Sequence, residues 1–374
     1  MKVRACLVVA AMIALALFLS RTIHPRHPSA LETTAAPVQP ASIDFNAARE
    51  VSPPLGAIPS NPVPMEPPRT AATNWLERLL AGDGEETRLP RAFIDRWLAS
   101  GRTNAEDLLA ARQAGGGIEF LHMALTNFPN DPRVLFAAIA LEDGPEAKRQ
   151  RLDRFKAAAP DNGLVDYLSA RDHFKNGRSE EGLADLMSAN SKKGFDDYGL
   201  DAVQNAEDLY LQSGKGPAEA KALATSSALL PQLAQMKGLA QDIASLQRQY
   251  LDAGDPASAE RLGQMGVQLG YQLSGAAGAR SLISDLVGIA VERIVLNPLD
   301  ADRSYDFLQE TPRERMAQLT ARRTAAKEDV QFINQWARGA SDATLISYFD
   351  RVKIYGESKA MEWIRQRQPA DLGP

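Results

Sequence analysis

The prolines of this chain are unevenly distributed, and their positions decide where regular structure can form. Eleven of the 23 prolines fall in the 49 residues from His24 to Ala72, as in the run VSPPLGAIPSNPVPMEPPRT. Because proline lacks an amide hydrogen and fixes its φ angle, such a stretch holds neither a helix nor the interior of a sheet. We therefore expect residues 24–72 to form a Pro-rich disordered linker that reaches on the order of 150 Å when stretched.

Beyond residue 73 the sequence is rich in alanine and leucine, which both favour helices. Apolar residues return at spacings of three and four, whereas alternating runs of Val, Ile and Thr are missing. Thr103 and Glu106 form the pattern of a capping box at one helix start. Further starts are indicated at Asp131-Pro132, Asp255-Pro256, Thr311-Pro312 and Ser341-Asp342. These signals predict an all-α fold of about fourteen helices, mostly of about 10 to 18 residues.

Three expected helix pairs carry small residues at fixed offsets. The first set is Ala170, Gly177, Gly182, Leu186 and Ala189; the second is Tyr250, Gly254, Ala259 and Gly266; the third is Tyr210, Gly214 and Ala220. The third set is offset by one residue from the other two. Antiparallel helices pack closely only where their side chains are small, so each set predicts a helical hairpin with a glycine in its turn.

These sets resemble the tetratricopeptide repeat over about residues 105–270, which implies an irregular helix-hairpin array, a TPR-like solenoid, with a protein-binding concave face. The sequence departs from the family pattern in three ways. The turn glycines Gly177, Gly214 and Gly254 are 37 and 40 residues apart, whereas the repeat has about 34. No tryptophan occupies the early position, and His173 stands where an aromatic residue is expected. A plain helical bundle built from similar hairpins is the alternative.

Two later stretches differ from the hairpins. Residues 263–296 begin with spaced glycines and continue with an apolar half, which predicts a helix pressed against a neighbour and then a central buried helix. The C-terminal helical region, residues 301–374, is richer in charge and aromatic side chains. We interpret its aromatic residues as closing the end of the array, and a partner groove is the alternative. They are Phe332, Trp336, Tyr348, Phe349, Tyr355 and Trp363.

An uncharged apolar run from Ala5 to Ser20 follows Lys2 and Arg4. Its 16 residues lie between the lengths of a signal-peptide core and a membrane span. The end of the run fits signal peptidase poorly, so we interpret residues 1–23 as an uncleaved signal anchor, a transmembrane segment, with a cleaved signal peptide as the alternative. The positive-inside rule then favours a membrane-anchored protein whose helical body is exported to the periplasmic, extracytoplasmic side.

Residues that carry chemistry are few. The histidines are His24, His27, His122 and His173, and the single cysteine is Cys6 in the apolar run. The body therefore lacks a disulfide of its own, and the sequence has no HExxH, GxSxG or GxxxxGK[ST] motif. A net charge of −5 without blocks of like charge argues against a nucleic-acid partner. We assign no catalytic, cofactor-binding or metal-ligating residues and no cofactor.

Two weak motifs are rejected. Ser213–Pro217, SGKGP, has letters of a phosphate-binding loop but no preceding strand, and it suits a hairpin turn better. The segment from Asp300 has acidic residues at spacings typical of a calcium loop. Tyr305 replaces the required glycine there, and Thr311 stands at position twelve, so no calcium site is expected.

One enzymatic reading rests on Glu357. The pair Glu357-Ser358 and the segment Ser274–Ile283 (SGAAGARSLI) resemble lytic transglycosylases, which are helical envelope enzymes with a single acidic catalyst. In that family the Glu-Ser pair comes first, whereas here the order is reversed. We interpret Glu357 instead as the first turn of a helix, where a carboxylate favours the positive end of the helix dipole.

The sequence thus predicts four segments, a signal anchor, a linker, a TPR-like array and a C-terminal helical region, with boundaries 1–23, 24–72, 73–300 and 301–374. The expected role is a non-catalytic, membrane-tethered helical-repeat protein that binds a protein or peptide in the bacterial envelope. The alternative is a hydrolase or lyase that acts on envelope polymer through carboxylates, which requires a cleft with a carboxylate of raised pKa. A structural spacer without a specific ligand is the third reading.

Overall fold

The computed structural model describes three ranges of the chain, residues 74–80, 88–274 and 281–367. Every regular element within these ranges is a helix, so the predicted all-α fold is confirmed. The β-type contacts in these ranges are two isolated bridges, one of which joins Asn162 and Gly194. None of the described helices has the length and apolar character needed to cross a membrane.

Two predicted segments, the signal anchor at 1–23 and the linker at 24–72, lie outside the described residues. The described α-helices are, in chain order, α2 (Asn74–Leu80), α3 (Arg91–Ala99), α4 (Ala105–Gln113), α5 (Ile118–Asn127), α6 (Pro132–Ala137), α7 (Pro145–Ala158), α8 (Gly163–Lys175), α9 (Ser179–Ser191), α10 (Gly199–Gln212), α11 (Pro217–Ser226), α12 (Pro231–Asp252), α13 (Pro256–Leu273), α14 (Leu282–Leu296), α15 (Pro312–Gly339), α16 (Asp342–Tyr355) and α17 (Glu357–Arg365). Their lengths run from 6 residues in α6 to 28 in α15, so the expected range of lengths is too narrow.

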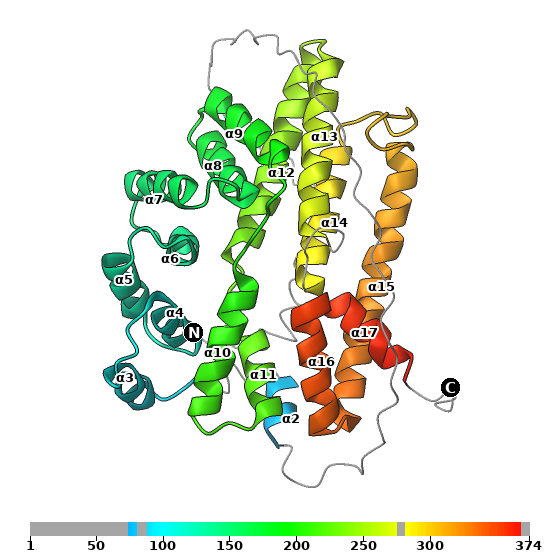
Figure 1. The fold of residues 1–374 in the computed structure, drawn as a ribbon. Helices are drawn as coiled ribbons and strands as arrows, with labels where there is room; N and C mark the ends of the chain where they lie inside the picture. Colours follow the sequence, from blue (N-terminus) through cyan, green and yellow to red (C-terminus); the bar gives the residue numbers. More distant parts are fainter. Residues whose placement is uncertain (1–73, 81–87, 275–280, 368–374) are drawn as a thin grey trace, which may run out of the picture.

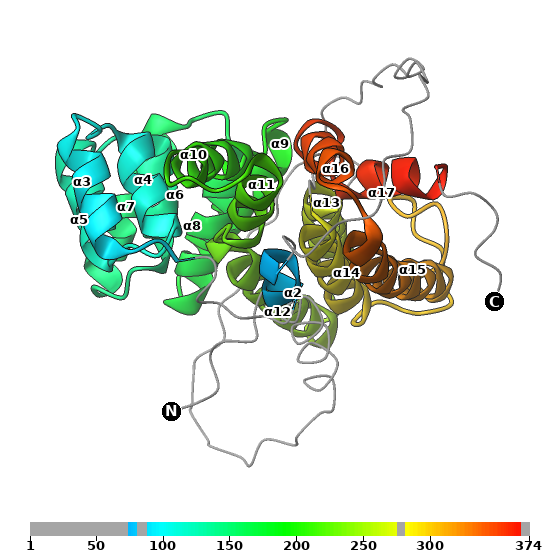
Figure 2. The same cartoon turned by 90° about the horizontal axis from the view of Figure 1, so that it is seen from below.

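Helices α3 to α9 form an array along one side of the molecule (Figure 1). Seen from below, α3, α5 and α7 lie outermost, and α4, α6 and α8 lie between them and helices α10 to α12 (Figure 2). Helix α4 packs against α10, and α8 packs against α12. The inner side of the array is therefore covered by later helices of the same chain. On the other side, α12, α13 and α14 run side by side, and α15 packs against α14.

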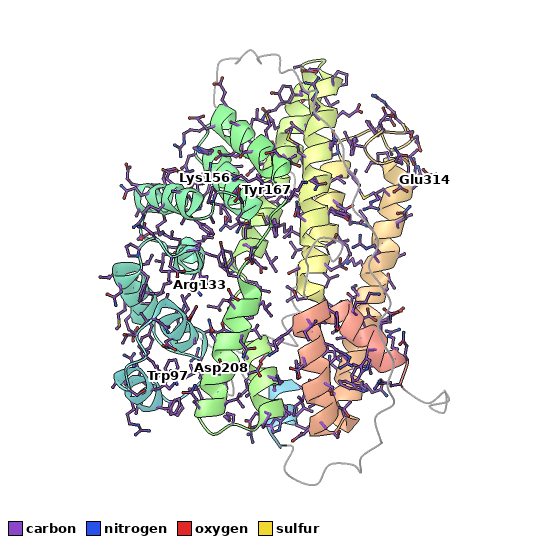
Figure 3. All side chains as sticks on the ribbon, in the orientation of Figure 1. Trp97, Arg133, Lys156, Tyr167, Asp208 and Glu314 are labelled. Atoms are coloured by element: carbon purple, nitrogen blue, oxygen red, sulfur yellow. The ribbon has the colours of Figure 1, made fainter. Side chains whose placement is uncertain are left out.

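Two core clusters are interleaved along the sequence. The first joins α2 to α5 and Val134 of α6 with α10, α11 and the corner between α15 and α16. The second joins α6 to α9 with α12, α13 and α14. Trp97, labelled in Figure 3, links α3 to α10 in the first cluster, because its indole Nε1 donates to Gln212 Oε1 at 2.9 Å. Each half of the array is thus completed by helices from far along the chain.

The three predicted hairpins form, as the pairs α8–α9, α10–α11 and α12–α13. Each turn has its glycine in the left-handed region, with φ of +72° at Gly177, +90° at Gly214 and +76° at Gly254. The amide of the residue that follows each glycine donates to the carbonyl of the residue four positions before the glycine. These bonds run from Arg178 to His173, Lys215 to Tyr210 and Asp255 to Tyr250, at 3.0, 3.2 and 2.8 Å. This is the Schellman motif, which favours a residue without a Cβ.

The second helix of each hairpin has a small buried residue at its fourth position, Gly182, Ala220 or Ala259. Helix α11 begins three residues after its turn glycine, whereas α9 and α13 begin two residues after theirs. The longer turn accounts for the one-residue offset of the third set in the sequence. The small residue permits close approach, since a Cβ on Gly182 would lie 2.8 Å from the ring of Phe174.

The glycines of α13 press this helix against α14, as predicted. A Cβ on Gly266 would lie 2.5 Å from Val295, and one on Gly270 would lie 2.4 Å from Cγ of Glu292. Helix α14 packs against α12, α13 and α15, and its Val291 and Val295 are fully buried. The prediction of a central buried helix is therefore confirmed.

The C-terminal helices enclose most of the predicted aromatic set. Phe332, Trp336, Tyr348, Phe349 and Trp363 belong to one cluster with Leu282 of α14. The ring centroids of Trp336 and Tyr348 are 5.4 Å apart at a tilted angle. Tyr355, by contrast, is 51% exposed at the end of α16. Five of the six aromatic residues therefore pack within the C-terminal helices, against the start of α14, and Tyr355 lies at the surface.

The predicted helix starts are confirmed at Asp131, Asp255, Thr311 and Ser341, whose side chains accept amide hydrogens of the first turn. The predicted start at Thr103 is wrong by one residue. Helix α4 begins at Ala105, and the side chain of Asn104 accepts the amide of Asp107 at 2.7 Å. Asparagine is a better N-cap than threonine, which favours the later start.

The connection between α9 and α10 is held by one buried side chain, Asn162. Its Oδ1 accepts the amide of Leu164 at 3.1 Å, at the start of α8, and the amide of Asp196 at 3.0 Å. Its Nδ2 donates to the carbonyl of Asp196 at 2.7 Å and to the hydroxyl of Tyr198 at 3.3 Å. Both donors and both acceptor positions of the amide are used. One residue therefore caps α8 and fixes the segment from which α10 begins.

We expect alanine at Gly254 to lower the free energy of unfolding by about 1–2 kcal/mol, because a Cβ is strained at positive φ. The same change at Gly339, the last residue of α15, meets no atom within 4 Å and has no positive φ. There alanine should be neutral or stabilise by up to about 1 kcal/mol. Urea unfolding of both variants measures the difference, and equal shifts would contradict the assignment of the turn.

Asn162→Ala should lower the free energy of unfolding by roughly 2–4 kcal/mol, since it removes four hydrogen bonds and leaves buried groups unpaired. Asn104→Ala is the matched control, because that side chain makes one capping bond, worth about 1 kcal/mol. Urea unfolding of the two variants under identical conditions tests the comparison. Equal losses would show that Asn162 acts as an ordinary helix cap.

Candidate functional site

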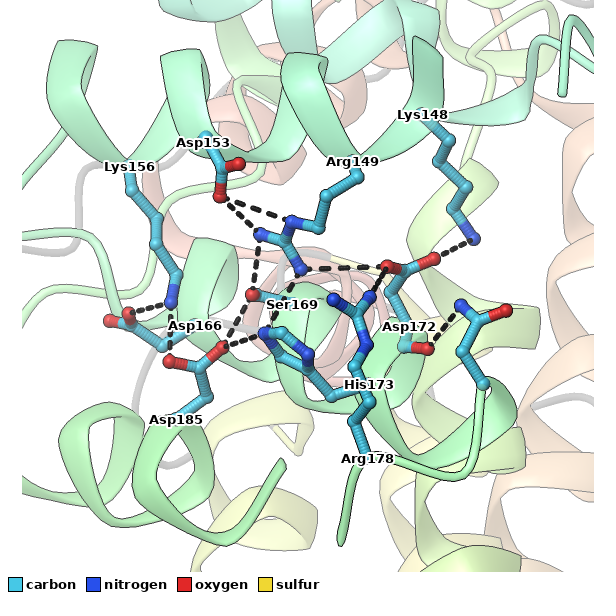
Figure 4. Close-up of polar contacts among 11 residues, drawn as sticks. Lys148, Arg149, Asp153, Lys156, Asp166, Ser169, Asp172, His173, Arg178 and Asp185 are labelled. Atoms are coloured by element: carbon cyan, nitrogen blue, oxygen red, sulfur yellow. Dashed lines mark hydrogen bonds and ion pairs between the residues drawn. The ribbon is translucent and has the colours of Figure 1, made fainter. Parts of the chain in front are cut away.

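A dense group of charged side chains lies between α7, α8 and α9 (Figure 4). We call it the α7–α9 polar network, and its members are Lys148, Arg149, Asp153, Lys156, Asp166, Ser169, Asp172, His173, Arg178, Asp185 and Lys192. The members on α8 are Asp166, Ser169 and the adjacent pair Asp172 and His173, about one turn apart, which places them toward one side of that helix. Helix α7 supplies cations to that face.

Two carboxylates of the network, Asp166 and Asp172, are almost fully buried, with Asp172 only 2% exposed. The cations around Asp172 are Lys148 at 3.6 Å, Arg149 at 3.4 Å and Arg178 at 3.6 Å. Those around Asp166 are Lys156 at 3.5 Å and Lys192. Removing one partner would leave a buried charge uncompensated. The network therefore fixes α7 and α9 against α8.

The network also brings together a serine, a histidine and an aspartate, the residue types of a hydrolase triad. In a triad the histidine stands between the other two and takes the proton of the serine. Here Asp185 stands between them, because it accepts the hydroxyl hydrogen of Ser169 and lies 3.4 Å from Nε2 of His173. Ser169 is also fully buried. This order does not activate Ser169 as a nucleophile.

The two histidines of the body lie in different surroundings. Burial lowers the pKa of His173, and Arg149, at 3.2 Å from its Nε2, acts in the same direction. A neutral His173 ring can accept a hydrogen bond from Arg149 at that nitrogen. His122 is exposed on α5. Within the described ranges no group of three or more His, Cys, Asp or Glu side chains is arranged to hold a metal ion.

The two rejected motifs lie in loops. The segment Ser213–Pro217 spans the turn of the α10–α11 hairpin, as interpreted from the sequence. In the loop after α14, the carboxylate of Asp302 receives two hydrogen bonds from Arg313, at 2.7 and 2.9 Å. Asp300 accepts the amide of Asp302 at 3.1 Å. These carboxylates therefore bond the loop's own backbone and Arg313 at the start of α15.

Glu357 begins α17, as predicted, and its carboxylate also contacts α14. Its Oε2 accepts the amide of Leu282 at 2.7 Å, and its Oε1 lies 3.5 Å from the hydroxyl of Tyr348. Burial raises the pKa of Glu357 in spite of these two bonds. Leu282 belongs to the segment that resembles lytic transglycosylases, so the structure brings both parts of that resemblance together. Most of the segment, residues 275–280, lies outside the described residues.

Glu292 is a further buried carboxylate, which the sequence analysis did not single out. It lies on α14, is fully buried, and its Oε2 receives hydrogen bonds from Nε and Nη2 of Arg315 at 2.9 and 2.6 Å. Burial raises the pKa of Glu292, while Arg315 acts in the opposite direction. Glu292 therefore ties α15 to α14. The only signal in the sequence was a charged residue inside an apolar helix.

A hollow between α6 and α7 has no room for a water molecule. It is lined by Leu135, Ile139, Lys148, Arg151, Leu152 and Phe155, and neither Glu292 nor Glu357 is among these residues.

Large apolar side chains are exposed where α10 and α16 meet. Leu200 and Leu211 are exposed on one stripe of α10, and Ile354 and Tyr355 are 65% and 51% exposed at the end of α16. We call these four residues the α10–α16 surface. Lys353 joins the two helices, because its Nζ donates to Gln204 at 2.9 Å and to Glu207 at 2.6 Å. A second lysine, Lys221 on α11, donates to both Glu207 and Asp350.

Comparison with known proteins gives no match, since no family model, no curated protein and no solved structure matches this chain. The resemblance to tetratricopeptide repeats stays a prediction. Inside the molecule, the acids of the α7–α9 polar network are paired with cations. On the outside, large apolar side chains are exposed at the α10–α16 surface.

We expect Glu357→Gln to stabilise the protein relative to the wild type increasingly as pH rises. The pKa of Glu357 is raised in the folded state. Its contribution to stability is therefore fully present below about pH 4.3 and is lost as pH rises through the folded pKa. Glutamine keeps an oxygen acceptor for Leu282 and does not titrate. Urea unfolding of both proteins at pH 4 and pH 8 measures the change.

Glu314 provides a control of opposite sign for this experiment. Hydrogen bonds from Thr311 lower the pKa of Glu314, so its contribution to stability is present at neutral pH and is lost as pH falls. Glu314→Gln should therefore weaken the protein at pH 8 and approach the wild type at low pH. If both variants changed in the same direction with pH, the burial of Glu357 would not be the cause.

Proposed function

We propose that this chain is a non-catalytic, membrane-tethered protein that binds a protein or peptide partner in the bacterial envelope through the α10–α16 surface. The observation that carries the proposal is the exposure of neighbouring large apolar side chains, Ile354 and Tyr355, beside the stripe of α10 that contains Leu200. Contiguous exposed apolar groups favour association with another macromolecule. The supporting helices are joined by ion pairs of two lysines, Lys221 and Lys353, with two acids, Glu207 and Asp350.

The covering of α4 and α8 by later helices supports a contact on the outside of the molecule. A repeat array commonly binds its partner along the concave face. In this chain α10 and α12 occupy that side of the array. The face of α10 that points away from α4 and the end of α16 supply the exposed apolar groups instead.

The tether is part of the proposal and rests on the sequence. The apolar run in residues 1–23 would hold the chain in the membrane, and residues 24–72 would separate the helical body from it. A partner in the same envelope would then meet the α10–α16 surface at a raised local concentration.

The alternative function, an envelope hydrolase or lyase, draws on carboxylates of raised pKa, and Glu357 is the one that belongs to the transglycosylase-like pair. Its raised pKa suits a general acid. Its two carboxylate oxygens, however, lie at the amide of Leu282 and the hydroxyl of Tyr348, within the protein. The Glu357→Gln variant also distinguishes the two functions. If the wild type releases fragments from envelope polymer and the variant does not, the enzymatic alternative is favoured.

A photo-crosslinking residue at position 354 of the complete chain, in the native cells, tests the proposed surface. We expect one discrete adduct from this position and none from position 154, which is exposed on α7. Tyr355→Asp should abolish the adduct, because a charge beside position 354 opposes burial of the apolar surface. The proposal would be contradicted if positions 354 and 154 gave the same adducts. It would also be contradicted if the adduct from position 354 persisted in the Tyr355→Asp variant.

A further inference from the structure

Two arginines lie over the ring of one tryptophan near the end of the described chain. The guanidinium carbon of Arg351, on α16, is 4.1 Å from the ring centroid of Trp363 on α17, and that of Arg367 is 4.7 Å from it. An aromatic ring attracts a cation through its quadrupole, and a planar guanidinium stacks on it. We call Arg351, Trp363 and Arg367 the arginine–tryptophan stack. It gathers two positive charges at one ring.

The arginine–tryptophan stack adjoins the α10–α16 surface. Ile354 and Tyr355 follow Arg351 by three and four residues on α16, so one turn of the helix places Arg351 beside both of them. Helix α17 begins directly after Gly356 and brings Trp363 against Arg351 (Figure 1). Exposed apolar side chains therefore border stacked cations. Tryptophan, tyrosine and arginine are the residue types that contribute most often to protein–protein binding.

No carboxylate within the described ranges is paired with Arg351. In these ranges its Nη1 donates to the carbonyl of Ser347, one turn earlier on α16, at 3.2 Å. The neighbouring carboxylate, that of Asp350, is bound by Lys221 at 2.6 Å. A guanidinium has five N–H donors, so most of those of Arg351 are available to a ligand. The chain thus holds a cation beside an exposed apolar surface without an acid of its own for that cation.

We propose that the partner binds through an acidic peptide segment, whose carboxylate is held by Arg351 while apolar side chains of the same segment cover Ile354 and Tyr355. This inference rests on the proposed function and names the chemistry of the partner. Arginine binds a carboxylate through two parallel hydrogen bonds. Stacking on Trp363 orders the guanidinium before binding, which lowers the entropic cost of the contact. Arg367 adds a second positive charge, which attracts the same segment.

An acidic peptide fits this surface better than a membrane of anionic lipids does. The side chain of Asp350 is 43% exposed and directly precedes Arg351 in the sequence. A charged lipid surface would approach both residues together and would be repelled by this carboxylate. A peptide can place a carboxylate at Arg351 and an apolar or uncharged side chain beside Asp350. The mixture of charges therefore favours a partner that carries its acids at discrete positions.

Charge reversal at Arg351 tests this inference in the complete chain, in the native cells, with the photo-crosslinking residue at position 354. Arg351→Glu should lower the yield of the adduct on the order of tenfold or more, because like charges then face each other across the contact. Arg351→Lys, which keeps the charge but not the two parallel hydrogen bonds, should cause a smaller loss. Arg154→Glu makes the same change of charge at an exposed position of α7 and should leave the yield unchanged.

Mass spectrometry of the adduct provides a second measurement, which decides even if Arg351→Glu impairs folding. We expect the captured segment of the partner to carry Asp or Glu within a few residues of the crosslink. Replacing that acid by arginine should restore the adduct of the Arg351→Glu chain, because the two charges are then exchanged. A merely structural role of Arg351 in holding α17 would not be rescued by a change in the partner.

The outcomes separate this inference from the proposed function. A captured segment without acidic residues, or an undiminished adduct in Arg351→Glu, would overturn the inference and leave the proposed surface in place. An equal loss in Arg154→Glu would overturn it too, because net charge would then be the cause. Capture of a lipid in place of a peptide, or no adduct from position 354 in the otherwise unchanged chain, would overturn both the inference and the proposed function.

Discussion

The arrangement of the two core clusters depends on the side-chain amide of Asn162. By bonding both the first turn of α8 and the segment before α10, it sets the direction in which the chain leaves the α8–α9 hairpin. Helix α10 then reaches α4, and α12 returns to α8. Both contacts close the inner side of the array. An amide suits this task because it offers two donors and two acceptor positions at one point, without a charge that burial would penalise.

Buried charge follows one rule across the molecule. Asp166, Asp172 and Glu292 each lie on a central helix, and the cations that neutralise them come mostly from a neighbouring helix. A hydrophobic replacement of similar volume often serves stability equally well. The ion pairs instead define which face of α7 meets α8 and which face of α15 meets α14. Charge thus helps to specify the register at these two junctions.

Local chemistry made part of this fold predictable. Gly177, Gly214 and Gly254 identified three hairpins, because a left-handed turn residue leaves a signal in the sequence itself. The contact of Glu357 with Leu282 joins residues 75 positions apart and has no such signal. The same holds for α4 against α10, since an apolar stripe shows that a helix is buried but not against what. The α10–α16 surface was equally hidden, because exposure of Ile354 depends on what the rest of the chain leaves uncovered.

The interleaving of the clusters has a consequence for the time course of synthesis. The first cluster needs α2 to α5 from the beginning of the described chain and Leu345 of α16 from near its end. Such sequence-distant contacts slow folding, because loop closure precedes the gain from packing. The N-terminal half of the array therefore emerges before α10 and α11, which cover its inner face, and the first cluster is complete only when α16 follows. During that interval its exposed apolar surface is prone to aggregation.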